Sequence, residues 1–202
     1  MEKNITVPRA VIFDMGGTIE DVKVDHLTYM EGADMIAARL YDSKITKRRL
    51  APEEVKELID GGLLEYKSWA MENGVESVPR DIWAKWLLGD ELVSEKALTM
   101  EMAEWLSFTQ ETRCLSRELR PEAHEVLTEL QKRGYGLGVV SNTISQTQVP
   151  YTLDVHDLTR YFQTVQASSV VGSRKPHPKM LQIAADELGE HTREADERAE
   201  GA

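Results

Sequence analysis

The chain has 202 residues, 41% of them hydrophobic, which is enough for one compact domain or for a core domain that carries a sizeable insertion. Its 24 lysines and arginines stand against 35 aspartates and glutamates, and the formal net charge of −11 excludes a positive field that would attract nucleic acid or anionic lipid. A single cysteine, Cys114, excludes an intrachain disulfide framework, and the lack of a signal-peptide core or of about 18 consecutive apolar residues predicts a cytoplasmic protein without a membrane span.

A first strand is predicted at residues 11–13. This β-branched and aromatic run, VIF, has Pro8 before it and the pair Gly16-Gly17 after it. An apolar run bounded by such breakers is typical of a short buried strand in a parallel sheet. The strand delivers Asp14 directly to a glycine-rich turn.

The next hundred residues or so, 21–118, are predicted to be helical, with no strand among them. The four predicted helices cover residues 26–42, 51–74, 79–90 and 94–108. The pair Gly61-Gly62 is expected to break or kink the second helix, and Ser94 is the expected N-cap of the fourth. The four tryptophans of this insertion lie at helical spacing, which favours a role in helix packing over contact with a substrate.

An alternation of helices and strands follows the insertion. The sequence predicts a helix over residues 120–134, a strand over 134–143, a third strand within 164–172 and a helix over 178–189. Together with the first strand, this order predicts an α/β domain built on a parallel sheet with right-handed crossovers. Residues 189–202 are charged and have no Val, Ile, Leu or aromatic side chain, so a frayed helix or a disordered tail is expected there.

Polar side chains follow the predicted strands at the sheet edge where ligands bind in open α/β folds. Asp14 follows the first strand, and Ser141 and Asn142 end the second. Lys175 lies in a later loop, and each of these residues alone is explained by a turn, a helix N-cap or an exposed loop position. Together they supply a carboxylate nucleophile, a hydroxyl and a cation, which phosphoryl transfer through an acyl phosphate needs, usually with Mg²⁺. Gly17 allows backbone N–H groups to approach a phosphate closely.

Three segments, in this order, resemble the motifs of the haloacid dehalogenase (HAD) superfamily of hydrolases. "VIFDMGGT" is similar to the first motif, an apolar strand followed by Asp-x-Asp-Gly-Thr; "GVVSNT" is similar to the second, a strand ending in Ser or Thr; and "SRKPHP" is similar to the third, a lysine before proline. The resemblance implies a Rossmann-like parallel sheet, the HAD-like core, made of residues 1–20 and 119–188. It also implies a helical cap, residues 21–118, inserted after the first motif, and leaves 189–202 as a charged tail.

The resemblance also implies a role for each matching residue. Asp14 would be the nucleophile and a Mg²⁺ ligand, the carbonyl of Gly16 a second metal ligand, and Lys175 the charge partner of the nucleophile and the phosphoryl group. The residues implied to bind the phosphate of the substrate are Gly17, Thr18, Ser141 and Asn142. The implied activity is that of a Mg²⁺-dependent, phosphatase-like hydrolase of small phosphorylated or related compounds, with the cap as a lid over the site.

Gly16 departs from the first motif, because phosphatases of the family place a second aspartate there as a general acid and base. Glycine has no group that can transfer a proton, and the loss of such help costs about 10² to 10⁴-fold in rate. Glu20 or Asp21 could replace the missing acid, and family members without that aspartate include phosphonate hydrolases and dehalogenases. The sequence therefore leaves both a replacement acid and an unusual leaving group open.

The third motif is followed by a helix but not by the strand that carries the acidic metal-binding motif of the family. A C-terminally shortened member with an incomplete Mg²⁺ site is therefore expected. Its first strand would be an exposed sheet edge with an uncovered apolar face, which favours self-association. Two functions stay open: hydrolysis through a covalent intermediate on Asp14, and a non-catalytic HAD-like remnant that binds a ligand or a protein.

Overall fold

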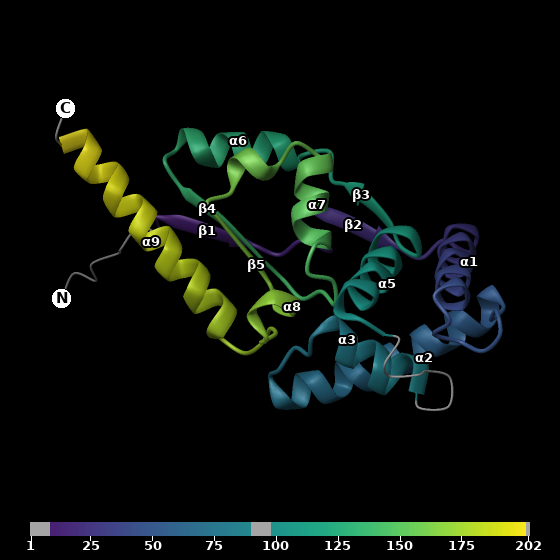
Figure 1. Cartoon of the computed structure of the whole chain (residues 1–202). Coiled ribbons are helices and arrows are strands. Elements are labelled where there is room, and N and C mark those ends of the chain that lie inside the picture. The colour runs from purple at the N-terminus through teal and green to yellow at the C-terminus, as the bar shows by residue number, and fades with distance from the viewer. Residues whose placement is uncertain (1–8, 90–97, 201–202) are drawn as a thin grey trace.

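A parallel sheet of three strands organises one part of the molecule in the computed structural model, which describes residues 9–89 and 98–200 (Figure 1). The strands are β1 (Ala10–Phe13), β4 (Gly136–Ser141) and β5 (Thr164–Ala167). Their order in the sheet is β1-β4-β5; β1 begins opposite Gly136 and β5 begins opposite Gly138. The three predicted strands are confirmed, although the third is shorter than its apolar run because a helix starts directly after it.

Helices cover both faces of this sheet (Figure 1). On one face lie α6 (Ala123–Lys132) and α7 (Gln148–Val155), whose apolar side chains pack against β1 and β4. On the other face α9 (Lys179–Glu200) packs against Val140 and Ile12. Two short helices complete this part of the chain, η2 (Thr159–Tyr161) and α8 (Ser168–Val171). The predicted α/β fold with a Rossmann-like parallel sheet is confirmed.

The residues between β1 and β4 include a helical unit, called here the helical insertion (residues 26–113). Its elements are α1 (His26–Asp42), α2 (Pro52–Asn73), α3 (Pro79–Ile82), the π-helix η1 (Trp83–Leu88) and α5 (Met100–Arg113). They enclose a hydrophobic core of their own, in which Trp83 is buried and donates its Nε1–H to Ser107 Oγ at 2.9 Å. Trp86 and Trp105 pack partly buried against this core, whereas Trp69 is more exposed, so the tryptophans mainly serve helix packing.

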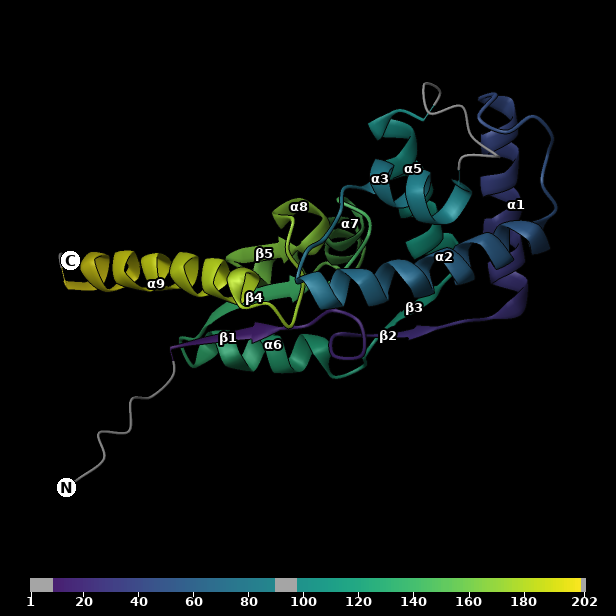
Figure 2. The same ribbon diagram turned by 90° about the horizontal axis from the view of Figure 1, so that it is seen from below.

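Two strands lie within the stretch that was predicted to contain none. β2 (Glu20–Lys23) pairs antiparallel with β3 (Ser116–Leu119), forming a ribbon that joins the helical insertion to the parallel sheet (Figure 2). Their sequences, EDVK and SREL, are polar and too short to show an apolar alternation. The prediction was wrong because the two strands pair over a long sequence separation, which local patterns do not reveal.

Two expectations about helix breaks and ends also change. α2 runs through its glycine pair without a break, and a side-chain carbon at Gly62 would lie 2.4 Å from the carbonyl oxygen of Trp86. The glycine therefore permits close approach of two helices instead of ending one. The predicted N-cap Ser94 lies outside the described residues, and α5 is capped by Thr99, whose hydroxyl accepts a hydrogen bond from the Met102 N–H at 3.2 Å.

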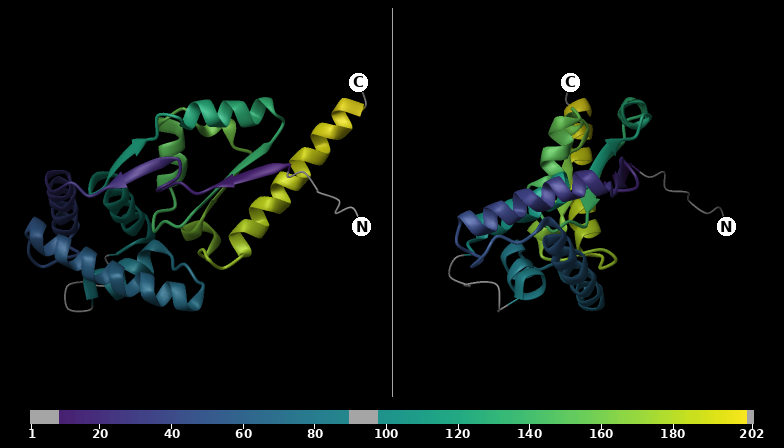
Figure 3. Two further views of the ribbon diagram at one scale, coloured as in Figure 1. Left: turned by 180° about the vertical axis from the view of Figure 1, so that it is seen from behind. Right: turned by 90° about the vertical axis from the view of Figure 1, so that its right-hand side faces the viewer.

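The charged end of the chain continues α9 (Figure 3). The helix includes residues 189–200, where a frayed helix or a disordered tail was expected. Alanine, glutamate and arginine are frequent there and have high helix propensity, which explains the continuation without any apolar stripe. Among the described residues, neither α9 nor another helix has the apolar length that crossing a membrane requires.

β1 lies at an edge of the sheet, as predicted, because within the described part of the chain it pairs with β4 alone. Its apolar side chains are nevertheless covered. Ile12 packs on the α9 side of the sheet, and Val11 and Phe13 pack on the side of α6 and α7. The expectation of an uncovered apolar face is therefore wrong, since α6 and α7 on one face and α9 on the other partly shield the strand.

Candidate active site

Polar residues from three segments meet beside the carboxyl ends of β1 and β4. Asp14 follows β1, Ser141 is the last residue of β4, and Lys175 lies in the loop between α8 and α9. All three line a cavity of about 330 Å³, called here the pocket, which Gly16 and Asn142 also line. The structure thus brings together five of the seven site residues predicted from the sequence.

Lys175 forms an ion pair with Asp14 in the lining of the pocket. Its Nζ lies 2.7 Å from Asp14 Oδ1 and donates a hydrogen bond to the carbonyl oxygen of Val140 at 2.8 Å. The N–H of Met15 donates to the same Asp14 Oδ1, also at 2.8 Å. Among the described residues no contact engages Asp14 Oδ2, and the side chain is 45% exposed. One carboxylate oxygen is therefore anchored, while the other has no hydrogen bond or ion pair with the described residues.

Asn142 orients the lysine loop. Its Oδ1 accepts a hydrogen bond from the Lys175 backbone N–H at 2.9 Å, and its Nδ2 donates to the Lys175 carbonyl oxygen at 3.1 Å. These two bonds tie the end of β4 to the loop that carries the pocket cation. Asn142 and the buried Ser141 both line the pocket, so the phosphate contacts predicted for them stay predictions.

The turn after Asp14 winds around the carbonyl oxygen of Met15, which accepts three backbone hydrogen bonds of 2.9–3.2 Å. This winding leaves Gly16 in the pocket lining but carries Gly17 and Thr18 away from it, and Thr18 lines a separate hollow. The phosphate contacts predicted for Gly17 and Thr18 are therefore not supported by their positions. The φ angle of Gly17, 79°, explains why a glycine occupies this turn.

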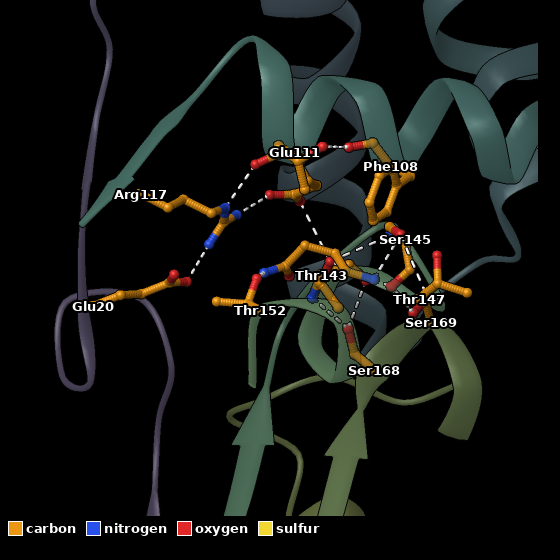
Figure 4. Close-up of polar contacts among 12 residues, drawn as sticks. Glu20, Phe108, Glu111, Arg117, Thr143, Ser145, Thr147, Thr152, Ser168 and Ser169 are labelled. Atoms are coloured by element: carbon orange, nitrogen blue, oxygen red, sulfur yellow. Dashed lines mark hydrogen bonds and ion pairs between the residues drawn. The ribbon is translucent and has the colours of Figure 1, made fainter. Parts of the chain in front are cut away.

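Neither of the two candidate replacement acids lines the pocket. The Glu20 side chain is fully buried and accepts a hydrogen bond from Arg117, whereas Asp21 pairs with Arg120 at 2.9 Å (Figure 4 shows Glu20 and Arg117). Burial raises the pKa of the Glu20 carboxyl, and the nearby Arg117 guanidinium lowers it in part. Both carboxylates pair with arginines in or next to β3, so the possibility that one of them replaces the acid missing at Gly16 has no geometric support.

Glu111 and Arg117 line the pocket although the sequence singled out neither. Arg117 lies between two carboxylates, donating to Glu20 from one terminal nitrogen and to Glu111 from the other, while its Nε donates to the Glu111 carbonyl oxygen at 2.6 Å (Figure 4). Glu111 also accepts a hydrogen bond from Thr143 Oγ1 at 3.5 Å. Within the described ranges, Asp14 and Glu111 are the two carboxylates of the pocket. Glu111 belongs to α5 and Arg117 to β3, and only the folded chain brings them to the pocket, so no local motif could identify them.

A divalent cation would find few protein ligands in this pocket. The Asp14 carboxylate and the backbone of Gly16 are both in its lining, and the part of the chain that the structure describes has no group of three or more His, Cys, Asp or Glu side chains that could hold a metal. Mg²⁺ commonly binds through one or two carboxylates together with water and substrate phosphate. The donor set therefore fits an ion shared with a phosphate, and does not fit a preformed protein cage.

The chain is similar to known sequences. Residues 8–195 match the family described as haloacid dehalogenase-like hydrolase. The pyrophosphatase PpaX of Oceanobacillus iheyensis is 35% identical over 71 residues, which cover 35% of this chain and 33% of that protein. The phosphoglycolate phosphatase of Nitrosococcus oceani is 25% identical over 182 residues, which cover 90% of this chain and 71% of that protein. The matched segment is therefore about a third of the length of the first of these relatives.

A similar fold is found among solved structures. CbbY from Rhodobacter sphaeroides, solved in complex with phosphate, superposes with a TM-score of 0.55 at 17% sequence identity, covering 91% of this chain and 73% of that chain. At this identity the likeness shows a shared fold and nothing about the ligand of this chain.

Proposed function

The chain belongs to the haloacid dehalogenase-like hydrolase family, and from this premise we propose that it hydrolyses small phosphorylated compounds with Asp14 as the nucleophile. The observation that carries the proposal is the 2.7 Å contact between Asp14 Oδ1 and Lys175 Nζ, in a pocket that Ser141 also lines. A phosphate bound there would meet a carboxylate, a cation and a hydroxyl at one place, as transfer through an aspartyl phosphate requires.

In the proposed reaction, Asp14 Oδ2 attacks the phosphorus atom, and the bond between phosphorus and the leaving oxygen breaks. Lys175 balances the negative charge on the phosphoryl oxygens, the Ser141 hydroxyl donates a hydrogen bond to one of them, and the leaving oxygen takes a proton from solvent. Water then attacks the phosphorus of the aspartyl phosphate, which releases inorganic phosphate and restores the carboxylate. Glu111 is proposed to accept the proton of that water, because Gly16 has no group to do so.

Mg²⁺ is proposed as an ion shared between the protein and the substrate. Asp14 and the carbonyl of Gly16 would hold it beside the phosphate, with water completing its ligands. The ion, when bound, supplies positive charge that brings the carboxylate and the phosphate together. Since the protein itself offers few ligands, saturable Mg²⁺ binding is expected only in the presence of phosphate or substrate.

The helical insertion is proposed to act as a lid that selects the substrate. Two relatives, a pyrophosphatase and a phosphoglycolate phosphatase, favour small phosphorylated substrates for this chain. The net charge of −11 disfavours nucleic acid as a partner. A cytoplasmic location stays a prediction from the sequence.

Hydrolysis of an aryl phosphate in the presence of Mg²⁺, compared between the wild-type chain and its Asp14→Asn variant, tests this function. We expect the variant to fall to the background rate, because an amide oxygen cannot replace the carboxylate as nucleophile. Removing Mg²⁺ with a chelator is expected to lower the wild-type rate to the same background. Circular dichroism and thermal melting of both proteins would show that each is folded.

Equal background rates from two folded proteins would contradict the hydrolase and favour a second candidate, a non-catalytic module that binds a ligand or a protein. The observation in favour of that candidate is Gly16, which removes the proton-transfer group from the first motif. Binding of inorganic phosphate to the wild-type chain without turnover would support it.

A further inference from the structure

The pocket holds more charge than the phosphoryl chemistry uses. Its charged lining residues are Asp14, Lys67, Glu111, Arg117, Arg174 and Lys175. Most of these side chains are paired within the protein: Asp14 with Lys175 at 2.7 Å, Arg174 with Glu76 at 2.6 Å, and Arg117 with both Glu111 and Glu20. The remaining charge, Lys67, has no ion pair or hydrogen bond with any residue that the structure describes.

Lys67 lies on α2, next to a buried tyrosine that is hydrogen-bonded to the segment after this helix. Its neighbour Tyr66 is fully buried, accepts a hydrogen bond from the Ser77 N–H at 2.9 Å and donates one to Glu76. This anchoring fixes α2 where it borders the pocket, while the Lys67 side chain itself stays exposed. The nucleophile and Lys175 belong to the sheet side of the pocket, so Lys67 presents a cation from the opposite structural unit.

We infer that Lys67 binds a second anionic group of the substrate, a carboxylate or another phosphate, while the reacting phosphoryl group lies at Asp14. The inference rests on the proposed function, because it takes the phosphoryl site as given. An ammonium group on a flexible side chain forms a charge-assisted hydrogen bond with such an anion, which is stronger than a bond between neutral groups. A substrate whose remaining part is uncharged would leave Lys67 without a partner.

The pairing of the other charges explains why this role falls to Lys67. Arg174 and Arg117 are held by carboxylates that are themselves buried, and drawing either guanidinium to a ligand would leave an unpaired charge in the protein interior. Lys175 is held by the nucleophile. Lys67 can turn toward a ligand without breaking any contact with the described residues.

Binding of three phosphonates, measured by calorimetry with Mg²⁺ present, separates the possibilities. Phosphonoacetate carries a carboxylate, methylenediphosphonate carries a second phosphoryl group, and ethylphosphonate carries neither. The wild-type chain is expected to bind phosphonoacetate or methylenediphosphonate, the probes with a second anionic group, about tenfold more tightly than ethylphosphonate. This is the effect of one charge-assisted hydrogen bond in a partly open site. The preferred probe shows which anion the site takes.

The Lys67→Gln variant is expected to lose this preference while its affinity for ethylphosphonate stays unchanged. Lys67→Arg should keep most of the preference, and Lys47→Gln, which removes an exposed lysine of the helical insertion outside the pocket, should behave as the wild type. A wild-type chain without preference, or a preference retained in Lys67→Gln, would overturn the inference and leave the phosphoryl site intact. Failure of all three phosphonates to bind would overturn both, whereas loss of aryl phosphate turnover alone would count only against the proposed hydrolysis.

Discussion

The two glycines after Met15 meet different structural demands. Gly17 has a φ of 79°, a backbone conformation that side chains disfavour. Gly16 lies outside that region, and a side-chain carbon there would lie 3.3 Å from Val22 Cγ2. Because the Val22 side chain is 39% exposed, it has room to move by the few tenths of an ångström required. Position 16 therefore has room for an aspartate. The backbone conformation does not require a glycine there, so the lack of the aspartate affects the chemistry of the site and not the fold.

The Gly16→Asp substitution should raise the rate of aryl phosphate hydrolysis. The new carboxyl group would lie in the pocket beside Asp14 and could transfer protons to and from the reacting oxygens, so we expect a gain of roughly 10²-fold in kcat. Steady-state kinetics of the wild type and the variant measures this change in kcat. Gly16→Asn is the matched control, since it has the same size but cannot transfer a proton, and an aspartate variant no faster than the asparagine variant would refute the expectation.

At the scale of elements, a buried polar cluster fastens the end of α2 to the loop before α9. Glu76 accepts hydrogen bonds from Tyr66, from Ser168 Oγ at 2.7 Å and from Arg174 Nη1 at 2.6 Å. Burial raises the pKa of the Glu76 carboxyl, and Arg174 offsets this only in part. The helical insertion is thus attached to the part of the chain that contains the parallel sheet, called here the sheet domain, and the contact is made by a carboxyl group whose charge is disfavoured.

This raised pKa gives protein stability a defined pH dependence. Between pH 4.5, the ordinary pKa of a glutamate, and the raised pKa of native Glu76, the unfolded chain holds fewer protons at this residue than the native protein does. The contribution of Glu76 to the free energy of unfolding is therefore fully present below pH 4.5. It falls as the pH rises through the native pKa of this carboxyl, by up to about 1.4 kcal/mol per pH unit.

The Glu76→Gln variant cannot titrate at this position, so its free energy of unfolding should fall less steeply with pH above 4.5 than that of the wild type. Urea unfolding at several pH values from 4.5 to about 8 measures both profiles. Glu72→Gln, which changes an exposed glutamate near the end of α2, should retain the wild-type slope. Parallel profiles for the wild type and Glu76→Gln would show that Glu76 is ionised throughout this range.

At the scale of the whole molecule, several polar contacts hold the helical insertion against the sheet domain. Glu104 of α5 accepts hydrogen bonds from Ser145 Oγ at 2.6 Å and from the Thr147 N–H at 3.0 Å. The Glu76 cluster and the Arg117 pairs contribute at other points, and the β2–β3 ribbon supplies the covalent connection. The pocket lies where these two units meet, so its shape depends on their docking.

Within the described part of the chain the parallel sheet has two edge strands, β1 and β5, and self-association is predicted through β1. The backbone groups of β1 on the outer side have no strand partner within the described part of the chain, and open edges favour pairing with a second copy. We expect sedimentation velocity to show self-association that increases with protein concentration. Ala10→Lys, which places a charge on this edge, should weaken it, whereas Met71→Lys on the exposed surface of the helical insertion should not. A monomer at all concentrations would contradict the expectation.

The order of strands and helices, and the residues Asp14, Ser141 and Lys175, could be predicted from the sequence. Their signals are local: an apolar run between breakers predicts a strand, and parallel strands end at the same edge of their sheet. Because β1 and β4 are adjacent and parallel, Asp14 and Ser141 lie at the same edge of the sheet, whatever structure the hundred or so residues between the two strands adopt. The edge position of β1 was predicted differently, through the resemblance to a known family.

The tertiary structure alone decided which other groups reach the pocket. Arg117 arrives there through the pairing of two short polar strands, Glu111 arrives from α5 and is bound by Arg117, and Lys67 arrives on α2, next to a buried polar cluster. Gly62 is explained in the same way, by the close approach of a second helix. These features depend on contacts between residues distant in sequence, whose energy comes from burial and charge pairing in the folded chain, and so no local pattern records them.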